Sequence, residues 1–310
     1  MLGASNSLPP KVLVVGGDSL IGSGLVEHFR SQGTSVGYTS RRPNHEAPDC
    51  IPLELGKAIA LPYIPEVAIL CAGVTDFRSC AEQPDATRRI NVDAVLELAA
   101  TLHLCGAHIL YLSSNAVCEI GKDSVQSHSL PPITTELGAQ KHDAECGILA
   151  LGERATVVRA AKVVSCKASL IASWLNRLSN DQTITPLSDY CLSPVSLQFM
   201  VTATAQLAFA GASGIFNISG AQTLSYSDFA YQLAAAMNVN IGLINPKNSL
   251  DLNFPSYYPR TLKSLGMLAM ISPSGILLQS VRSVIVDLLV EFSIEQSSTN
   301  HAYPTLSEKR

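Results

Sequence analysis

Apolar positions along the first half of the chain follow two alternating patterns. Short runs of consecutive apolar residues, rich in β-branched side chains, alternate with longer stretches in which apolar residues recur every three or four positions. A short continuous run is typical of a strand buried on both faces, and the longer spacing is typical of an amphipathic helix. The runs predict strands at residues 11–15, 35–39, 67–71, 108–112 and 155–159.

Three amphipathic helices are predicted between these strands. The first carries its apolar stripe from Leu20 to Phe29 and ends at Gly33, and the other two span residues 89–104 and 135–151. Strands separated by helices form right-handed crossovers onto a parallel sheet. The pattern therefore predicts an α/β fold, namely a Rossmann-type doubly wound parallel sheet with a smaller C-terminal substrate lobe.

The remainder of the chain has a less regular pattern. A short strand is predicted at residues 51–55 and another at 215–218, and helices are predicted at 227–237 and 280–292. Residues 295–310 are mostly polar and lack an apolar period, so a flexible tail is expected there.

These elements suggest a division of the chain into two parts. The Rossmann domain is expected to comprise residues 10–165 with about 193–221 and 263–294, and the substrate lobe about 166–192 and 222–262. The lobe is expected to cover the carboxyl edge of the sheet. Trp174 falls in this lobe, where it either lines the substrate pocket or belongs to the core.

Composition narrows the possible partners. Hydrophobic residues make up 47% of the 310 residues and charged residues only 15%, which favours extra buried surface such as a subunit interface. The net charge of −4 and the lack of Lys/Arg runs argue against a nucleic-acid partner, and no apolar stretch is long enough for a membrane helix. The eight cysteines are scattered without a CxxC pair, which favours free thiols, a cytoplasmic location and no metal site.

A glycine-rich turn follows the first predicted strand. The chain reads GGDSLIG from Gly16 to Gly22 and then enters the first helix. Glycines in such a turn let the backbone approach a pyrophosphate, and the helix N-terminus supplies free N–H groups. Ser19 stands where a further glycine is usual, and the alternative interpretation is an ordinary tight turn. The context of strand, turn and helix favours a dinucleotide site that includes Gly16, Ser19, Leu20, Ile21 and Gly22.

The end of the second predicted strand bears on the choice of cofactor. An NAD-selective site has an acidic residue there to hold the ribose hydroxyls, whereas this chain has Arg41 and Arg42. Guanidinium groups can bind a 2′-phosphate in a bidentate manner. NADP(H) is therefore favoured over NAD(H), and the alternative is that both arginines belong to a solvated loop.

Several motifs in order resemble those of one enzyme family, the extended short-chain dehydrogenase/reductases. The similarity covers about residues 11–293 and is strongest to the dTDP-4-dehydrorhamnose reductase-like branch, related to the NAD-dependent epimerases and dehydratases. The motifs are VVGGDSLIG, CAGVTDFRSC, RRINVDAVLELA, YLSSNAV, TTELGAQKHDAE, LSPVSLQFM and GIFNISGAQTLSYSDFA.

The resemblance implies roles for individual residues. Asn91 corresponds to an asparagine of a proton relay, and Ser114 to the residue that hydrogen-bonds the substrate carbonyl. Lys141 corresponds to the lysine that binds the nicotinamide ribose and lowers the pKa of a catalytic tyrosine. The resemblance also puts Cys71, Ala72 and Gly73 in the cofactor site.

The family's tyrosine falls on Leu137, which has no proton to give. A positioned general acid contributes roughly 10²–10⁴ in rate. Ordinary carbonyl reduction is therefore impaired unless another group supplies the proton. Glu136, His142, Cys118 and Tyr190 are candidates for that group, although surface or core roles are the simpler interpretation of each.

The sequence thus favours an NADP(H)-binding reductase or epimerase that acts on a nucleotide sugar or a similar small carbonyl substrate, with altered acid–base residues. Residues 121–132 suit a substrate-covering loop, but they lack the basic cluster that would clamp a diphosphate. Two alternatives stay open: a catalytically silent cofactor-binding regulatory or scaffold protein, and a recruited non-redox lyase or cyclase.

The resemblance also implies a homodimer built on helices 89–104 and 135–151.

Overall fold

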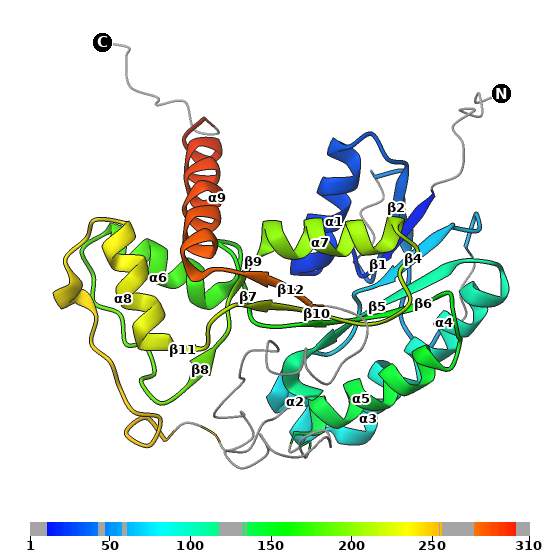
Figure 1. Ribbon diagram of the computed structural model, residues 1–310, viewed down its shortest axis with the longest axis horizontal. Coiled ribbons are helices and arrows are strands. Elements are labelled where there is room, and N and C mark those ends of the chain that lie inside the picture. Colours follow the sequence, from blue (N-terminus) through cyan, green and yellow to red (C-terminus); the bar gives the residue numbers. More distant parts are fainter. Residues whose placement is uncertain are drawn as a thin grey trace, which may run out of the picture.

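The computed structural model describes residues 11–42, 47–57, 61–117, 133, 135–253, 255 and 276–301. Its centre is a parallel sheet of eight described strands in the order β12-β10-β6-β5-β4-β1-β2-β3, which confirms the predicted Rossmann-type fold (Figure 1). The strands are β1 (Val12–Val15), β2 (Val36–Ser40), β3 (Cys50–Pro52), β4 (Val67–Leu70), β5 (His108–Ser114), β6 (Ala155–Ala160), β10 (Gly214–Gly220) and β12 (Ile276–Gln279).

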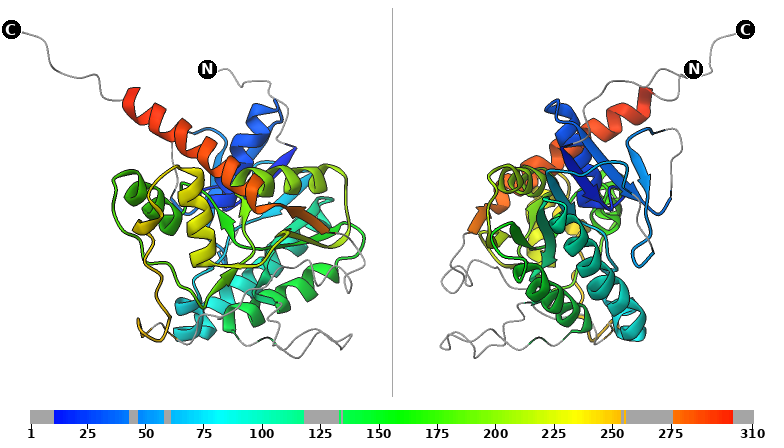
Figure 2. Two further views of the ribbon diagram at one scale, coloured as in Figure 1. Left: turned by 60° about the vertical axis from the view of Figure 1, so that its left-hand side comes forward. Right: turned by 90° about the vertical axis from the view of Figure 1, so that its right-hand side faces the viewer.

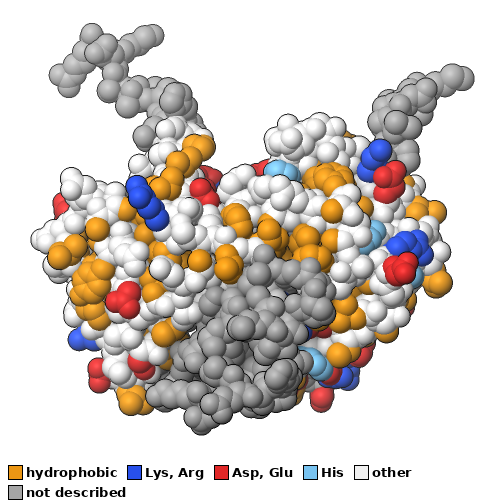
Figure 3. Space-filling model, viewed as in Figure 1, with side chains coloured by type: hydrophobic (Ala, Val, Ile, Leu, Met, Phe, Trp, Pro, Cys, Tyr) orange, Lys and Arg blue, Asp and Glu red, His pale blue; other side chains and the backbone are white. Residues whose placement is uncertain are grey.

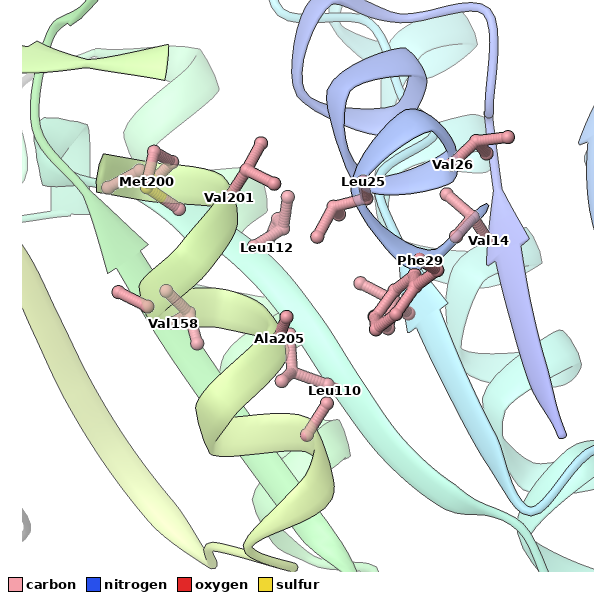
Figure 4. Packing of buried hydrophobic residues seen from close by; sticks show 14 of the residues in the cluster. Val14, Leu25, Val26, Phe29, Leu110, Leu112, Val158, Met200, Val201 and Ala205 are labelled. Carbon is pink, nitrogen blue, oxygen red and sulfur yellow. The ribbon is translucent and has the colours of Figure 1, made fainter. Parts of the chain in front are cut away.

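Helices cover both faces of this sheet, as Figure 2 shows from two directions. On one face α1 (Leu20–Ser31) and α7 (Leu197–Phe209) pack against the sheet, and Figure 4 shows Phe29 of α1 and Met200 of α7 beside the strand residues Val14 and Val158. On the other face α4 (Val95–Leu104) and α5 (Glu136–Leu149) pack on alternate residues of the same strands. Strands buried on both faces explain the continuous apolar runs in the sequence.

The predicted helix 89–104 begins in a different form. After α2 (Phe77–Glu82) and α3 (Pro84–Arg88), residues Arg89–Ala94 wind as a π-helix before α4 continues. Such a wider turn re-aims side chains and occurs often at functional sites. A short 3₁₀ turn, Asn115–Val117, follows β5.

A second apolar core lies beside the sheet. It is formed by α6 (Ser169–Ser179), α8 (Tyr226–Ala236) and α9 (Val281–His301). Trp174 is 5% exposed in this core and meets the Tyr226 ring edge-on, so it is a core residue. The other elements here are β7 (Val163–Val164), β8 (Cys191–Leu192), β9 (Val195–Ser196), β11 (Leu224–Ser225) and the 3₁₀ turn Ile241–Leu243.

Two sequence predictions concern this end of the molecule. Helix α9 continues to His301, so residues 295–301 are helical, and the flexible tail expected at 295–310 stays a prediction. The Ser297 and Ser298 hydroxyls each donate to the carbonyl one turn earlier. Residues of α9 also pack in the same core as α6 and α8, and the division into a Rossmann domain and a substrate lobe stays a prediction.

Candidate active site

The glycine turn between β1 and α1 is tightly constrained. Gly16 has a φ of +84°, and a Cβ there would lie 2.8 Å from the backbone nitrogen of Ala72. The Ser19 hydroxyl donates to the Gly16 carbonyl oxygen (2.8 Å) and accepts from the Gly22 N–H (3.1 Å), so it caps α1. The first-turn N–H groups of Leu20 and Ile21 have no acceptor within the helix. A turn in which glycine lets the backbone come close to a ligand, next to backbone N–H groups without an acceptor, fits a pyrophosphate.

A pocket of about 390 Å³ opens beside this turn. Arg41 and Arg42 are exposed at its rim, and the Thr39 hydroxyl in its wall accepts from the Gly16 N–H at 3.0 Å. Glu54 lines the same pocket and pairs with Lys57 at 2.7 Å, an acid that the sequence pattern did not indicate. Most of the predicted cofactor residues line the pocket, namely Gly16, Ser19, Arg41, Arg42, Cys71, Ala72 and Gly73.

Asn91 lies in the π-helical turn and is 1% exposed. Its side-chain oxygen accepts from the Val74 N–H (2.7 Å), while its amide nitrogen donates to the Val74 carbonyl (2.9 Å) and to the Gln140 side chain (2.8 Å). The side chain therefore joins the loop after β4 to α5. A Cβ at Gly73 would come within 2.9 Å of the Asn91 oxygen, so this loop is closely fitted to it.

Lys141 is buried beneath the carboxyl end of β5. Its ammonium donates to the Leu112 carbonyl oxygen at 2.9 Å and lies 4.6 Å from the centre of the Tyr111 ring. Burial lowers the pKa of Lys141 to about 8, although the Glu145 carboxylate acts in the opposite direction. Ser114 is partly buried two residues beyond Leu112, and its hydroxyl accepts from the Ala116 N–H at 3.2 Å. Two of the three predicted catalytic residues, Ser114 and Lys141, thus lie at the same end of β5.

Leu137 is 3% exposed on α5, one turn before Lys141 and on the same helix face. The apolar Leu137 side chain therefore occupies the position that corresponds, by the family resemblance, to the catalytic tyrosine. Two of the candidate replacements have other partners: the Glu136 carboxylate accepts from Gln140 (3.0 Å), and the partly exposed His142 lies 3.6 Å from Asp143.

The other two candidate donors are Tyr190 and Cys118. Tyr190 is 7% exposed, and its backbone carbonyl accepts from the Tyr226 N–H at 3.0 Å, which ties it to the start of α8. Cys118 and the predicted covering loop 121–132 lie outside the described residues.

A row of polar residues that sequence reasoning missed crosses three strands near the same edge. Ser113, Arg159 and Asn217 are register partners on β5, β6 and β10. Arg159 makes a buried ion pair with Glu145 of α5 at 2.7 Å. Both polar atoms of the Asn217 side chain and the Ser113 hydroxyl are buried without a hydrogen-bond partner. An arginine inside an apolar strand was the one sequence signal for this row.

Lys162 is a further residue that sequence reasoning missed. It follows β6 by two positions and is partly buried. A single lysine after an apolar strand gives no distinctive pattern, so only the fold brings it to the edge that carries Ser114.

Within the described ranges, no group of three or more His, Cys, Asp or Glu residues could hold a metal ion. The helices among those residues are also too short or too polar to cross a membrane.

Comparison with known proteins gives related matches. The family model of the RmlD substrate binding domain matches residues 10–289. The probable low-salt glycan biosynthesis reductase Agl14 of Haloferax volcanii is 24% identical over 260 residues, 80% of this chain and 87% of that protein. Methionine adenosyltransferase 2 subunit beta of Xenopus laevis is 24% identical over 249 residues, 76% of this chain and 75% of that protein.

A solved structure shows the same fold. The dTDP-4-dehydrorhamnose reductase of Bacillus anthracis, crystallised in complex with NADP, superimposes with a TM-score of 0.74 at 17% identity. The match covers 93% of this chain and 100% of that one. The family resemblance expected from the motifs is confirmed together with the fold.

Proposed function

Because the chain belongs to the family of the RmlD substrate binding domain, we propose that it is an NADP(H)-dependent reductase or epimerase. Its substrate is a nucleotide sugar or a similar carbonyl compound, and its acid–base residues are altered. The reductase of Bacillus anthracis was crystallised with NADP, and the relative from Haloferax volcanii is a probable glycan biosynthesis reductase. Both support this assignment.

One observation carries the proposal. The glycine turn follows β1 and Ser114 ends β5, and only β4 separates these two strands in the parallel sheet. Both features therefore lie at the carboxyl edge, where open α/β sheets bind their ligands. A dinucleotide with its pyrophosphate at the turn extends along this edge, with Arg41 and Arg42 near one end and Ser114 and Lys141 near the other.

The chain's residues then have distinct tasks. The bound cofactor supplies the hydride, and the Ser114 hydroxyl donates a hydrogen bond to the substrate carbonyl oxygen. One N–H of the Lys141 ammonium donates to the Leu112 carbonyl, and its other N–H groups bind the nicotinamide ribose. Leu137 contributes no proton, so the acid comes from another side chain.

The direct test is NADPH oxidation, followed by absorbance, with dTDP-4-dehydrorhamnose as the substrate. Turnover that falls at least tenfold in both Ser114→Ala and Lys141→Ala supports the proposal. Binding of NADPH without any turnover would exclude reductase activity on this substrate, and full activity in both variants would place the site elsewhere.

A second function is favoured by two observations, Leu137 and the similarity to methionine adenosyltransferase 2 subunit beta of Xenopus laevis. In this alternative the chain is a regulatory subunit that binds the cofactor without using it. NADPH would then bind with micromolar or better affinity, Lys141→Ala would weaken that binding, and no substrate would cause oxidation.

A further inference from the structure

The pairing of strands β5 and β6 in the sheet places Lys162 near Ser114. Ser114 and Ala160 are register partners on β5 and β6, and Lys162 is two residues beyond Ala160. The Ala161 N–H donates to the Ile218 carbonyl, which continues the ladder between β6 and β10 by one residue, and the Lys162 carbonyl accepts from the Val195 N–H. Strand spacing and rise give a Cα separation of roughly 8 Å between Ser114 and Lys162. A flexible four-carbon stem can span much of such a distance.

The Lys162 ammonium has no carboxylate partner among the described residues, although its side chain is partly buried. The nearby acid of α5, Glu145, is already paired with Arg159, and Lys141 of the same helix is bonded to Leu112. Burial lowers the pKa of Lys162, and no charged group among the described residues contributes to that shift. A desolvated charge without a counter-ion is unfavourable, so its retention calls for a ligand or a reaction that uses it.

We propose that the Lys162 ammonium is the proton donor that replaces the tyrosine absent at Leu137. The proposal rests on the reductase function proposed above and names the acid of that same site. Lysines with a lowered pKa are effective acids and bases near neutral pH, which an ordinary surface lysine is not.

The step balances as follows. The hydride leaves C4 of the reduced nicotinamide and forms a C–H bond at the substrate carbonyl carbon, so the cofactor is oxidised and the carbonyl is reduced. The carbonyl oxygen takes a proton from the Lys162 nitrogen, which becomes a neutral amine. Solvent then returns a proton to that amine. The sum is carbonyl plus NADPH plus one proton to alcohol plus NADP⁺.

Two lysines compete for this role, and their contacts separate them. The Lys141 ammonium donates to a main-chain carbonyl and faces the Tyr111 ring beneath the strand, which suits binding and orientation. Lys162 has no such partner among the described residues.

The test compares Lys162→Met and Lys162→Arg with the wild type, and Lys167→Met serves as control. Lys167 is an exposed lysine of the same segment that pairs with Glu27 and Glu295. With dTDP-4-dehydrorhamnose and NADPH, we expect kcat to fall about 10²-fold in Lys162→Met. Arginine keeps the positive charge but does not release its proton near neutral pH, so the kcat of Lys162→Arg is expected to fall to a similar degree. Lys167→Met is expected to keep the wild-type rate.

The pH profile separates a donor from a merely structural lysine. A proton donor must be protonated, so the wild-type kcat falls as pH rises through the pKa of Lys162, which lies below 10.5. Lys141 also loses its proton near pH 8, so Lys162→Met is expected to keep only the decline that belongs to Lys141, while NADPH affinity stays within twofold. An unchanged profile, or an Arg variant with full activity, would overturn the proposal. An inactive wild type that binds NADPH would instead exclude the proposed reductase function on this substrate.

Protein labelling gives a measurement that needs no turnover. Competitive acetylation across pH 7–11, read by mass spectrometry, is expected to report a lower pKa for Lys162 than for Lys167, and protection of Lys162 by NADPH. An ordinary lysine pKa without protection would contradict the proposal even if a variant failed to fold.

Discussion

Arg41 and Arg42 set the charge at the rim of the cofactor pocket, while Asp18 and Glu54 line the same pocket. Because Glu54 is paired with Lys57, the two arginines are the cations available to a 2′-phosphate there. A hydrogen bond to a charged group contributes about 1.5–3 kcal/mol, which corresponds to tenfold or more in affinity.

We therefore expect NADPH to bind at least tenfold more tightly than NADH, and Arg41→Ala with Arg42→Ala to remove this preference. Fluorescence titration of the reduced nicotinamide measures both affinities. Lys11→Ala, which removes an exposed positive charge before β1 and outside the pocket lining, is the control. Equal affinities in the wild type would contradict the assignment of the arginines.

Lys141 makes stability depend on pH in a specific direction. Its folded-state pKa of about 8 lies below the ordinary lysine value of 10.5, because burial disfavours the charged form. Below pH 8 Lys141 is protonated in both the folded and the unfolded state, so burial of its charge lowers the free energy of unfolding in full. This destabilisation disappears as pH rises toward 10.5. Relative to Lys141→Met, the wild type is therefore expected to gain stability between about pH 8 and 10. Urea unfolding at several pH values measures this difference, and a flat difference would contradict the burial of the charge.

At the scale of elements, α5 carries most of the polar contacts that build the site. Gln140 bonds Asn91, Lys141 bonds Leu112, and Glu145 pairs with Arg159 of β6. These side chains contact the π-helical turn at Asn91, β5 and β6 from one helix. The position of α5 therefore determines the geometry of the whole edge.

Breaking the Glu145–Arg159 pair tests this dependence. Glu145→Gln leaves a buried guanidinium without its counter-charge, and such changes cost about 3–5 kcal/mol. The double variant Glu145→Leu with Arg159→Met removes both charges and is expected to recover most of that loss. Urea unfolding gives the free energies, and a single variant as stable as the wild type would show that the pair does not hold α5.

Much of this architecture follows from the sequence because buried parallel strands need continuous apolar runs. The strands β1, β2 and β4, which begin at Val12, Val36 and Val67, each lie within one or two residues of the range predicted from an apolar run. The helices α6 and α7 were not predicted: α7 is buried over much of its surface, so no clean apolar period distinguishes it. The π-helical start at Arg89 is equally invisible to a pattern of apolar residues.

The site was predictable only where a motif has a fixed local context. The glycine turn has a strand before it and a helix after it, and Lys141 follows Leu137 by one helical turn. Lys162 and Asn217 depend on strand order and register instead, which no local pattern encodes. The sequence therefore offered Glu136, His142, Cys118 and Tyr190 as acids, whereas Lys162 becomes a candidate only through the pairing of Ser114 with Ala160.

For the whole molecule, the predicted homodimer stays a proposal that concerns α4 and α5. Their outer surface mixes polar residues with Leu104, which is 86% exposed at the end of α4. Another exposed apolar stripe lies on α9, at Val286, Val290 and Ile294. Figure 3 shows one face of the molecule, where hydrophobic side chains are interspersed with polar ones and Lys and Arg are few.

Light scattering at micromolar concentration is expected to give twice the monomer mass of 32.9 kDa. Leu104→Glu is expected to shift the equilibrium toward monomer, whereas Ile294→Glu on α9 leaves it unchanged. A dimer broken only by Ile294→Glu would move the interface to α9, and a wild-type monomer would contradict the dimer altogether.

In the proposed mechanism this fold still reduces a carbonyl, and the acid has moved from α5 to the end of β6. The most direct measurement is single-turnover NADPH oxidation with dTDP-4-dehydrorhamnose in Lys162→Met, with and without Leu137→Tyr. The phenol restores an acid one turn before Lys141, so the double variant is expected to react at least tenfold faster than Lys162→Met. Leu137→Phe, which adds the ring without the hydroxyl, is expected to restore nothing, and Leu137→Tyr alone is expected to leave the wild-type rate unchanged or lower it by crowding. A wild type that never oxidises NADPH, or a Lys162→Met rate equal to that of the wild type, would contradict the account.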